Sequence, residues 1–569
     1  MLHVLRATVI ILINRNNPNT MTNERISIAN YLLDRLTEFN IKHLFGIPGD
    51  FVLPLFVALE NHSITHIGTC NELNAGYAAD GYARINGMGA VAATYGPGAF
   101  SFVNAVASSY AERVPVVVVS GGPRTPAYND RLKLHHVLPE KYDASVKIFE
   151  QITEFAVVIK DVAQAPAIID QALQTCWQRK RPVYIEIPAD IQIAECDAPA
   201  SPLDLEAMQT APDALSGVVN KMIASIEQGK RTCLLPGHEI HRFGLQNKII
   251  ELSEVADMPV ASLFIGKPDY LEHLPVSMGT YQGGVTPDSV REFIEGADTL
   301  LCLGAIESDF NLGGFTEDFN NSDVFWVRHD EVICPDEIVA NIYLTDIVDA
   351  LLAHFKVRSR KNDKAAPCEW YYPTSEQLPE VSDEPITDRY FFDRFSQFLQ
   401  PNDLVAVDGG GLINSAYWQM PEGAQLVGSG YWASIGAGFG MGVGACFATG
   451  DDSRLLIVAG DGSFQMTAQE LSTLTRYGKS AIVFVLNNQG YTAERVIHDG
   501  SFNDIADWKY HKLVEPFGGR GIDVHIVRDF DNALNEAVNY SDAAPLVIEV
   551  HLDPFDVSDV FKRLAATLK

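Results

Sequence analysis

The chain is poor in basic residues. Lys and Arg number 42 against 73 Asp and Glu, so the formal net charge is −31 and the isoelectric point is near 4.8. A surface that binds nucleic acid or anionic lipid needs clustered Lys and Arg. We therefore expect no nucleic-acid partner and no membrane partner, and we take chemistry on a small molecule as the default function.

Closely paired cysteines are also missing. The eight cysteines are scattered along the chain and form no CxxC pair. This spacing suggests neither a disulfide framework nor a zinc site, and it suits a reducing compartment, so we expect a cytoplasmic protein. The cysteines are Cys70, Cys176, Cys196, Cys233, Cys302, Cys334, Cys368 and Cys446.

A convincing targeting signal is lacking too. The only segment that resembles one is the apolar run at residues 5–13, which is too short to span a bilayer. Asn14-Arg15-Asn16-Asn17 follows it, where a cleavage site would have small residues. We expect residues 1–21 to be an unstructured N-terminal extension. Met21 directly precedes the first amphipathic pattern, so a start at Met21 is the alternative.

The length and composition predict several domains. With 569 residues the chain is too long for one core and fits three domains of ordinary size, and its hydrophobic content of 47% lets each bury a core. Residues 199–212 form a connector rich in Pro, Ala and Asp, and residues 357–386 are charged, aperiodic and contain Pro. The predicted domains are residues 22–198, 213–356 and 387–569, with a linker at 357–386.

Helical and strand patterns alternate through these domains. Ile28, Leu32 and Leu36 recur at helical spacing, and the next apolar run, residues 41–45, has the length of a strand. Uninterrupted Val/Ile runs between helices are typical of parallel sheets covered on both faces, so we predict an α/β fold with three consecutive domains built on mainly parallel sheets. Further predicted strands are residues 91–95, 116–120, 183–187, 232–235, 299–303, 324–327, 404–407, 455–459, 481–487 and 546–550.

A glycine-rich turn follows one predicted strand of the third domain. Residues 455–459 run into Gly460-Asp461-Gly462-Ser463, and a helical crossover leads to the next strand, which ends in Asn487-Asn488. Two parallel neighbours bring these ends to the carboxyl edge of one sheet, where α/β proteins bind ligands. Glycines let the backbone approach a diphosphate, and carboxylate and amide oxygens are ligands that Mg²⁺ prefers.

Other interpretations of this turn have less support. A Gly-Asp-Gly sequence on its own is usually only a turn. The chain has no Walker loop, and no GxGxxG opens a helix after the first strand, so the P-loop and dinucleotide-binding interpretations lose support. The position of the turn and its spacing to Asn487-Asn488 favour a diphosphate and Mg²⁺ site.

These segments resemble the thiamine-diphosphate enzymes, whose signature is GDG followed at about this distance by NN. Residues 487–498, with Asn503-Asp504-Ile505 and Trp508, look like the pyruvate, indolepyruvate and branched-chain 2-oxo acid decarboxylases. The resemblance implies a pyrimidine-binding domain, a central domain and a diphosphate-binding domain, in that order. It also implies thiamine diphosphate and Mg²⁺ as cofactors.

The resemblance assigns the ligands of the third domain. It implies that Asp461, Asn488 and the main-chain carbonyl of Gly490 hold Mg²⁺, which in turn holds the diphosphate. Gly460, Gly462 and Ser463, the other members of the glycine-rich turn, are expected to bind the cofactor as well.

A glutamate in the first domain carries a second part of the chemistry. Thiamine is a poor nucleophile until C2 of its thiazolium loses a proton to the cofactor's own aminopyrimidine, and a carboxyl group that exchanges a proton with that ring promotes the step. By composition alone, Glu72 would be a residue at a helix start favoured by the dipole. Residues 70–84 are similar to the family's glutamate motif, which assigns this role to Glu72. In this family the glutamate and the diphosphate site belong to different subunits, so the resemblance implies a homodimer, with a tetramer left open.

Two further segments resemble the 2-oxo acid decarboxylase pattern. Residues 46–51 place Asp50 just after a strand, and His135-His136 lie in a polar stretch of the first domain. On their own, adjacent histidines usually belong to a solvated loop. By resemblance, Asp50, His135 and His136 form a proton relay and Glu494 lies near the substrate carboxylate. A relay is needed because the carbon that loses CO₂ must be protonated before an aldehyde is released.

The third domain contains two more matches. Trp432-Ala433-Ser434-Ile435-Gly436 is similar to a family stretch whose apolar side chain holds the cofactor in a bent shape, with Ile435 at that position. Asp408-Gly409-Gly410-Gly411 only approximately resembles the family's diphosphate loop, which leaves its contacts open. For Arg495 we expect a structural role as the ion-pair partner of Glu494.

The implied function is the non-oxidative decarboxylation of a 2-oxo acid to an aldehyde and CO₂. Ala493 stands where a bulkier aliphatic residue would narrow the pocket, which favours a branched or aromatic 2-oxo acid over pyruvate. One alternative is a carboligase, acetolactate-synthase-like or acyloin-forming, against which His135-His136 argues. Another is a noncatalytic thiamine-binding protein, which would be expected to have lost Glu72 or a metal ligand. A nucleotide in the central domain stays open.

Overall fold

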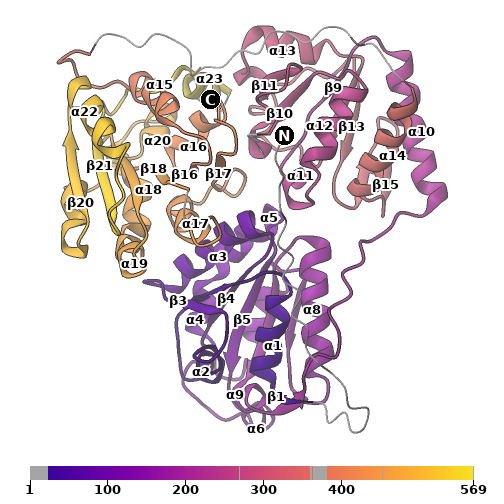
Figure 1. Cartoon of the computed structure of the whole chain (residues 1–569), viewed down its shortest axis with the longest axis vertical. Coiled ribbons are helices and arrows are strands. Elements are labelled where there is room, and N and C mark those ends of the chain that lie inside the picture. The colour runs from indigo at the N-terminus through magenta and orange to yellow at the C-terminus, as the bar shows by residue number, and fades with distance from the viewer. Residues whose placement is uncertain (1–23, 268–269, 359–361, 363–380, 451–452, 568–569) are drawn as a thin grey trace, which may run out of the picture.

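The described residues form three α/β domains. The computed structural model describes residues 24–267, 270–358, 362, 381–450 and 453–567. Figure 1 shows the N-terminal domain at the bottom, the central domain at the upper right and the C-terminal domain at the upper left. Each is built on one large sheet, which confirms the predicted fold class. The predicted extension at residues 1–21, with Met21, and most of the predicted linker lie outside the described residues.

The N-terminal domain has a parallel sheet in the order β3-β2-β4-β5-β7-β6. Its strands are β3 (Thr65–Ile67), β2 (His43–Gly46), β4 (Gly89–Ala93), β5 (Val116–Gly122), β7 (Val183–Pro188) and β6 (Phe155–Val158). Its helices are α1 (Ile28–Thr37), α2 (Leu53–Leu59), α3 (Glu72–Asn86), α4 (Pro97–Ser101), α5 (Val103–Ala111), α6 (Thr125–Asp130), α7 (Ala144–Phe149), α8 (Ala165–Arg179) and α9 (Ala189–Gln192). A separate antiparallel pair, β1 (Arg25–Ser27) and β8 (Glu195–Asp197), ties the start of this domain to its end.

The C-terminal domain repeats this topology. Its parallel sheet has the order β17-β16-β18-β19-β21-β20, the same order when the strands of each sheet are counted along the chain. Its strands are β16 (Leu404–Val407), β17 (Gln425–Val427), β18 (Leu455–Gly460), β19 (Ala481–Asn487), β20 (Arg520–Val524) and β21 (Pro545–His551). Its helices are α15 (Asp388–Phe398), α16 (Gly410–Ser415), α17 (Ala437–Ala445), α18 (Asp461–Thr467), α19 (Leu471–Arg476), α20 (Thr492–Ile497), α21 (Tyr510–Leu513), α22 (Val527–Ala537) and α23 (Asp559–Thr567).

The central domain has a mixed sheet. Its order is β11-β10-β9-β12-β13-β14-β15, and β14 is antiparallel to both of its neighbours, β13 and β15. Its strands are β9 (Thr232–Leu234), β10 (Val260–Leu263), β11 (Ser277–Tyr281), β12 (Thr299–Leu303), β13 (Asp323–Val327), β14 (Glu331–Ile333) and β15 (Ile338–Ala340). Its helices are α10 (Pro212–Gln228), α11 (Glu239–Arg242), α12 (Gln246–Val255), α13 (Asp288–Glu295) and α14 (Leu344–Val357).

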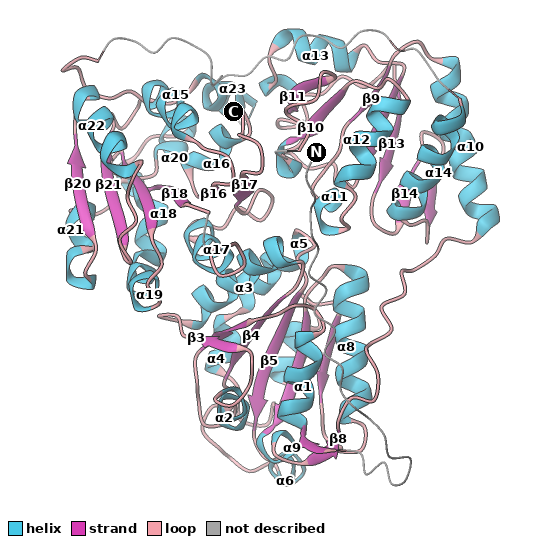
Figure 2. Ribbon diagram, viewed as in Figure 1, coloured by secondary structure: helices cyan, strands magenta, loops and turns pink. Residues whose placement is uncertain are grey.

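The structure confirms the predicted strands. Their apolar runs form strands that are buried on both faces of the sheets. Every residue of β5 and β19 is buried, and helices flank the sheets (Figure 2). One hydrophobic core continues from the N-terminal into the C-terminal domain, since Phe45 and Tyr82 belong to the same cluster of buried side chains as Phe439 and Val483. The first and third domains are thus packed into one body.

Helices α3 and α17 carry the contact between these two domains (Figure 1). A Cβ added at Gly444 of α17 would lie 1.8 Å from the carbonyl oxygen of Ala78, and one at Gly81 of α3 would lie 2.0 Å from that of Met441. No side chain fits at such distances. Glycine is therefore required on both helices so that their backbones can touch.

Two simple features complete the fold. Every cysteine in the described part of the chain is a free thiol. Among the described residues, no helix is both long enough and apolar enough to cross a membrane.

The helix contact predicts the effect of a single methyl group. Gly444→Ala should lower the midpoint of the first thermal unfolding transition, because overpacking costs about 1–3 kcal/mol or more. Gly217→Ala in α10 is the control, since a Cβ there meets nothing within 4 Å and the change favours a helix by up to about 1 kcal/mol. Scanning calorimetry measures both midpoints. A Gly444→Ala protein as stable as the wild type would contradict the close packing.

Candidate active site

The glycine-rich turn and the asparagine pair lie at one sheet edge, as the crossover pattern predicts. Strand β18 ends at Gly460 and α18 begins at Asp461, while the parallel neighbour β19 ends at Asn487. Asn488 directly follows that strand. Both segments therefore lie at the carboxyl edge of the C-terminal sheet, where α/β proteins bind ligands.

The three predicted Mg²⁺ ligands converge. As placed in the structure, the side-chain oxygen of Asn488 faces the carbonyl oxygen of Gly490 at 2.9 Å and Oδ1 of Asp461 at 3.2 Å. Without a cation, the amide would satisfy its hydrogen bonds only by turning its nitrogen toward these two oxygens. Three hard oxygen ligands that face one another are the donor set that Mg²⁺ prefers.

The pKa of the Asp461 carboxyl group is set by burial and by backbone hydrogen bonds. Burial raises the pKa of its carboxyl group to about 6, although the N–H groups of Gly462 and Gly490, which donate to it at 2.7 and 3.0 Å, lower it. A cation beside the carboxylate would favour its ionised form. A metal ion bound here would therefore stabilise the ionised carboxylate of Asp461 at its buried position.

The expected pairing of Arg495 with Glu494 is wrong. Arg495 donates to the carbonyl oxygens of Asn488 at 2.9 Å and Gln489 at 2.6 Å, and it pairs with Asp504 at 2.9 Å. Adjacent residues on α20 point in different directions, so Arg495 is buried under the turn while Glu494 is exposed. Arg495 is structural as expected, but it supports the ligand segment.

A cavity of about 350 Å³ opens beside these ligands. Asp408, Gly409 and Gly410 of the loosely matching loop line it too, whereas a Cβ at Gly411 would contact Val458. The side chain of Ile435 is 40% exposed and lines this cavity. The predicted residues that line the cavity are Ile435, Gly460, Asp461, Gly462, Ser463, Asn488, Gly490 and Glu494.

Two buried carboxylates to which the sequence motifs assign no role hold the segment around Ile435. Asp408 accepts hydrogen bonds from the N–H groups of Gly436 at 3.2 Å and Gly438 at 2.7 Å. Glu112, from the N-terminal domain, accepts from the N–H groups of Tyr431 at 2.9 Å and Trp432 at 3.0 Å. In the sequence, Asp408 is marked only by its place as the first residue of the glycine loop, and no pattern marks Glu112.

The predicted acid–base residues form a second group on the N-terminal domain. Nε2 of His135 lies 2.7 Å from Oδ2 of Asp50, and the rings of His135 and His136 have centroids 4.6 Å apart. His135 also stacks on Phe51 with ring centroids 5.0 Å apart. Asp50, His135 and His136 are exposed. The three residues that the resemblance assigns to a proton relay therefore touch one another.

Glu72 lies near this group. It is the first residue of α3, whose start is capped by Asn71, because the Asn71 side chain accepts from the N–H group of Asn74 at 2.8 Å. A Cβ at Gly98 would lie 3.4 Å from Oε1 of Glu72, and one at Gly96 would lie 3.1 Å from Cβ of His136. The turn at residues 96–98 thus connects Glu72 to the histidines.

The N-terminal group does not line the cavity beside Asp461 in the single chain. The described lining of the cavity beside Asp461 includes neither Glu72 nor Asp50, and neither of the adjacent histidines. The two groups of predicted residues therefore lie at separate places, one on each terminal domain of the chain.

Comparisons with known proteins agree with this architecture. Residues 26–146 match the N-terminal TPP binding domain of thiamine pyrophosphate enzymes, residues 219–343 their central domain, and residues 410–550 their C-terminal TPP binding domain.

Three relatives resemble the chain along nearly its whole length. A pyruvate decarboxylase of Aspergillus fumigatus is 33% identical over 95% of this chain and 96% of its own length. Pyruvate decarboxylase isozyme 1 of Saccharomyces cerevisiae is 30% identical over 93% and 96%, and an alpha-keto-acid decarboxylase of Mycobacterium tuberculosis is 33% identical over 95% and 97%. The chain therefore belongs to the thiamine pyrophosphate-dependent 2-oxo acid decarboxylase family and is an enzyme of that class.

Proposed function

We propose that this enzyme removes CO₂ from a 2-oxo acid without oxidation, releases an aldehyde, and uses Mg²⁺ to hold thiamine diphosphate. The observation that carries the proposal is the convergence of Asp461, Asn488 and the Gly490 carbonyl at the edge of the cavity. When bound, thiamine diphosphate supplies the carbon nucleophile and accepts the electrons left by CO₂. The chain contributes ligands, orientation and protons.

Other residues that line the cavity have separate proposed roles. Gly410 and Gly460 have no protein atom within about 3.8 Å of an added Cβ, so the backbone there is open to a close approach by the diphosphate. Ile435 offers an apolar surface for the body of the cofactor, and Asp408 holds its segment in place. Glu494 lines the same cavity. We assign it a position near the carboxylate of the substrate.

We assign protonation to the N-terminal group. Glu72 exchanges a proton with the pyrimidine, and Asp50, His135 and His136 deliver a proton to the carbon that lost CO₂. These residues have to reach a cavity that they do not line within their own chain. A partner's N-terminal domain placed over the cavity would complete the site, which supports a homodimer as the smallest active unit.

The lining of the cavity favours a substrate with a large apolar side chain. Ala493 is exposed and lines the cavity next to Glu494, so its single methyl group leaves room beside the substrate. We therefore assign a branched or aromatic 2-oxo acid. A carboligase would instead join the carbon that lost CO₂ to a second carbonyl compound. Its product would combine two substrates, and no aldehyde would be released.

A panel of 2-oxo acids tests this function. With thiamine diphosphate and Mg²⁺, equal amounts of CO₂ and aldehyde should form, and kcat/KM should be higher for 4-methyl-2-oxopentanoate or 3-phenylpyruvate than for pyruvate. A buried methylene changes discrimination by about 1–3 kcal/mol, so a preference of about 10-fold or more is expected. Chelation and dialysis should abolish turnover until cofactor and Mg²⁺ are both returned.

The matched variant is Ala493→Leu, which narrows the pocket without touching a ligand. It should move the preference toward pyruvate. Turnover by metal-free protein would contradict the Mg²⁺ assignment. A pyruvate preference in the wild type that Ala493→Leu does not change would contradict the substrate assignment.

The relay makes a separate prediction. His135→Ala should slow aldehyde release by about 10²-fold or more, because it removes a proton donor. Decarboxylation followed with an artificial electron acceptor, which needs no protonation of product, should fall much less. His62→Ala is the control, since His62 also contacts an aspartate of the same domain, Asp34, at 3.2 Å. An equal loss in both assays would assign His135 to binding or folding instead.

A further inference from the structure

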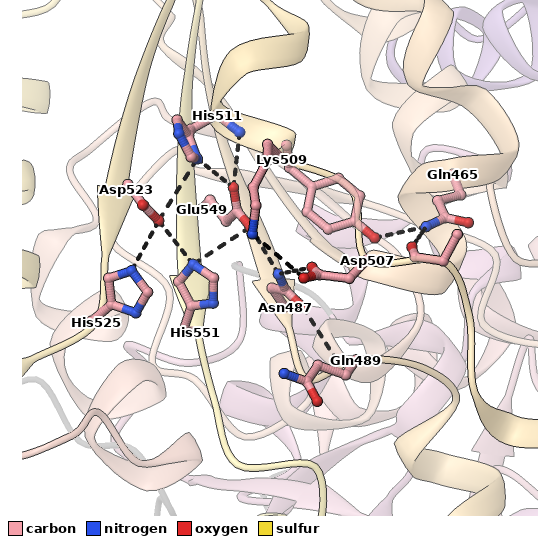
Figure 3. Close-up of polar contacts among 12 residues, drawn as sticks. Gln465, Asn487, Gln489, Asp507, Lys509, His511, Asp523, His525, Glu549 and His551 are labelled. Carbon is pink, nitrogen blue, oxygen red and sulfur yellow. Dashed lines mark hydrogen bonds and ion pairs between the residues drawn. The ribbon is translucent and has the colours of Figure 1, made fainter. Parts of the chain in front are cut away.

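A second cluster of potential metal ligands lies at the far edge of the C-terminal sheet. Edge strand β20 contributes Asp523, and His525 follows it closely. Its neighbour β21 ends at His551. Figure 3 shows the rings of His525 and His551 side by side, each with one nitrogen directed at Asp523.

The three side chains converge on one carboxylate oxygen. Nε2 of His551 lies 2.8 Å and Nε2 of His525 lies 3.3 Å from Oδ1 of Asp523. The two rings are stacked, with centroids 3.9 Å apart. One potential ligand atom from each residue lies within 4.8 Å of the others.

Strand register brings these residues together. Asp523 pairs with Glu549 across β20 and β21. Side chains two residues apart on a strand point to the same face, so Glu549 and His551 lie on one face, beside Asp523 and His525. The arrangement is built by two adjacent strands, with His525 directly after Val524, the last residue of β20.

The ligand chemistry points to a transition metal. Two imidazoles and a carboxylate match the protein ligands of open zinc sites, and in tetrahedral coordination neighbouring ligand atoms are about 3.3 Å apart. The observed separations of 2.8 and 3.3 Å are close to that value. Mg²⁺ prefers oxygen ligands in an octahedron, so it would not compete well here.

We propose that Asp523, His525 and His551 bind a divalent transition-metal ion of the Zn²⁺ type, at a site separate from the Mg²⁺ site. The ion would enter between the three side chains and replace their direct contacts. The side chains of His525 and Asp523 are 58% and 41% exposed, which lets the ion arrive from solvent.

A second carboxylate lies directly behind the cluster. Fully buried Glu549 contacts Nδ1 of His511 at 2.5 Å and lies 3.5 Å from Nε2 of His551.

The cluster is also connected to the proposed active site. Glu549 accepts a hydrogen bond from the side chain of Asn487 at 2.8 Å, and Asn487 directly precedes the proposed Mg²⁺ ligand Asn488. Metal binding has to be measured with the diphosphate site filled, so that the two sites are not confused.

Titration calorimetry of the holoenzyme tests the proposal. With saturating thiamine diphosphate and Mg²⁺, the wild type should bind one Zn²⁺ per chain, and Co²⁺ should give the visible absorption of a low-coordinate site. His525→Ala should weaken Zn²⁺ binding by at least about tenfold. Because His525 is largely exposed, this variant should fold, which circular dichroism checks. His551→Ala should have the same effect.

The control is His273→Ala, which removes another exposed histidine that belongs to no described cluster of potential metal ligands. It should bind Zn²⁺ as the wild type does. Wild-type protein that binds no Zn²⁺ under these conditions would overturn the proposal. So would a folded His525→Ala protein with wild-type affinity, or an equal loss in the His273→Ala control.

Discussion

The packing of helix α3 against α17 sets the positions of Glu72 and of the segment around Ile435 within the chain. Helix α3 begins at Glu72, and α17 begins shortly after Ile435. Their backbones touch because Gly81 and Gly444 have no side chains at the contact. Polar bonds reinforce this packing, since Tyr77 of α3 lies 3.0 Å from the hydroxyl group of Ser434. A shift of one helix would therefore move Glu72 relative to Ile435 in the same chain.

Buried carboxylates organise the cavity at an electrostatic cost. Burial raises the pKa of Asp408 and of Asp461 to about 6, and backbone N–H groups partly offset this for each of them. Asp408 uses its hydrogen bonds to hold the segment after Ile435, whereas Asp461 points to Asn488 and Gly490. A metal ion at Asp461 would supply the positive charge that burial makes favourable.

The sequence predicts the sheets well because their strands are continuous apolar runs, such as residues 481–487, which form β19. It also indicates Asp461 and Asn488, since each directly follows a recognisable strand. Contacts between distant segments are harder to predict. Glu112 and Tyr431 meet only when the two terminal domains pack, and the partner of Arg495 depends on the path of the chain to Asp504. His525 and His551 become neighbours only once β20 and β21 pair in register.

In the proposed function, one chain carries two half-sites and the complete active site forms between two chains. Co-expression of Glu72→Ala and Asp461→Ala chains with different tags, followed by purification of the mixed dimer, tests it directly. Each homodimer should be nearly inactive. In the mixed dimer one site combines both lesions, while the other receives intact Glu72 and intact Asp461 from opposite chains, so about half of the wild-type activity should return. Verified mixed dimers as inactive as their parents, beside active wild-type dimers with the same tags, would contradict the claim.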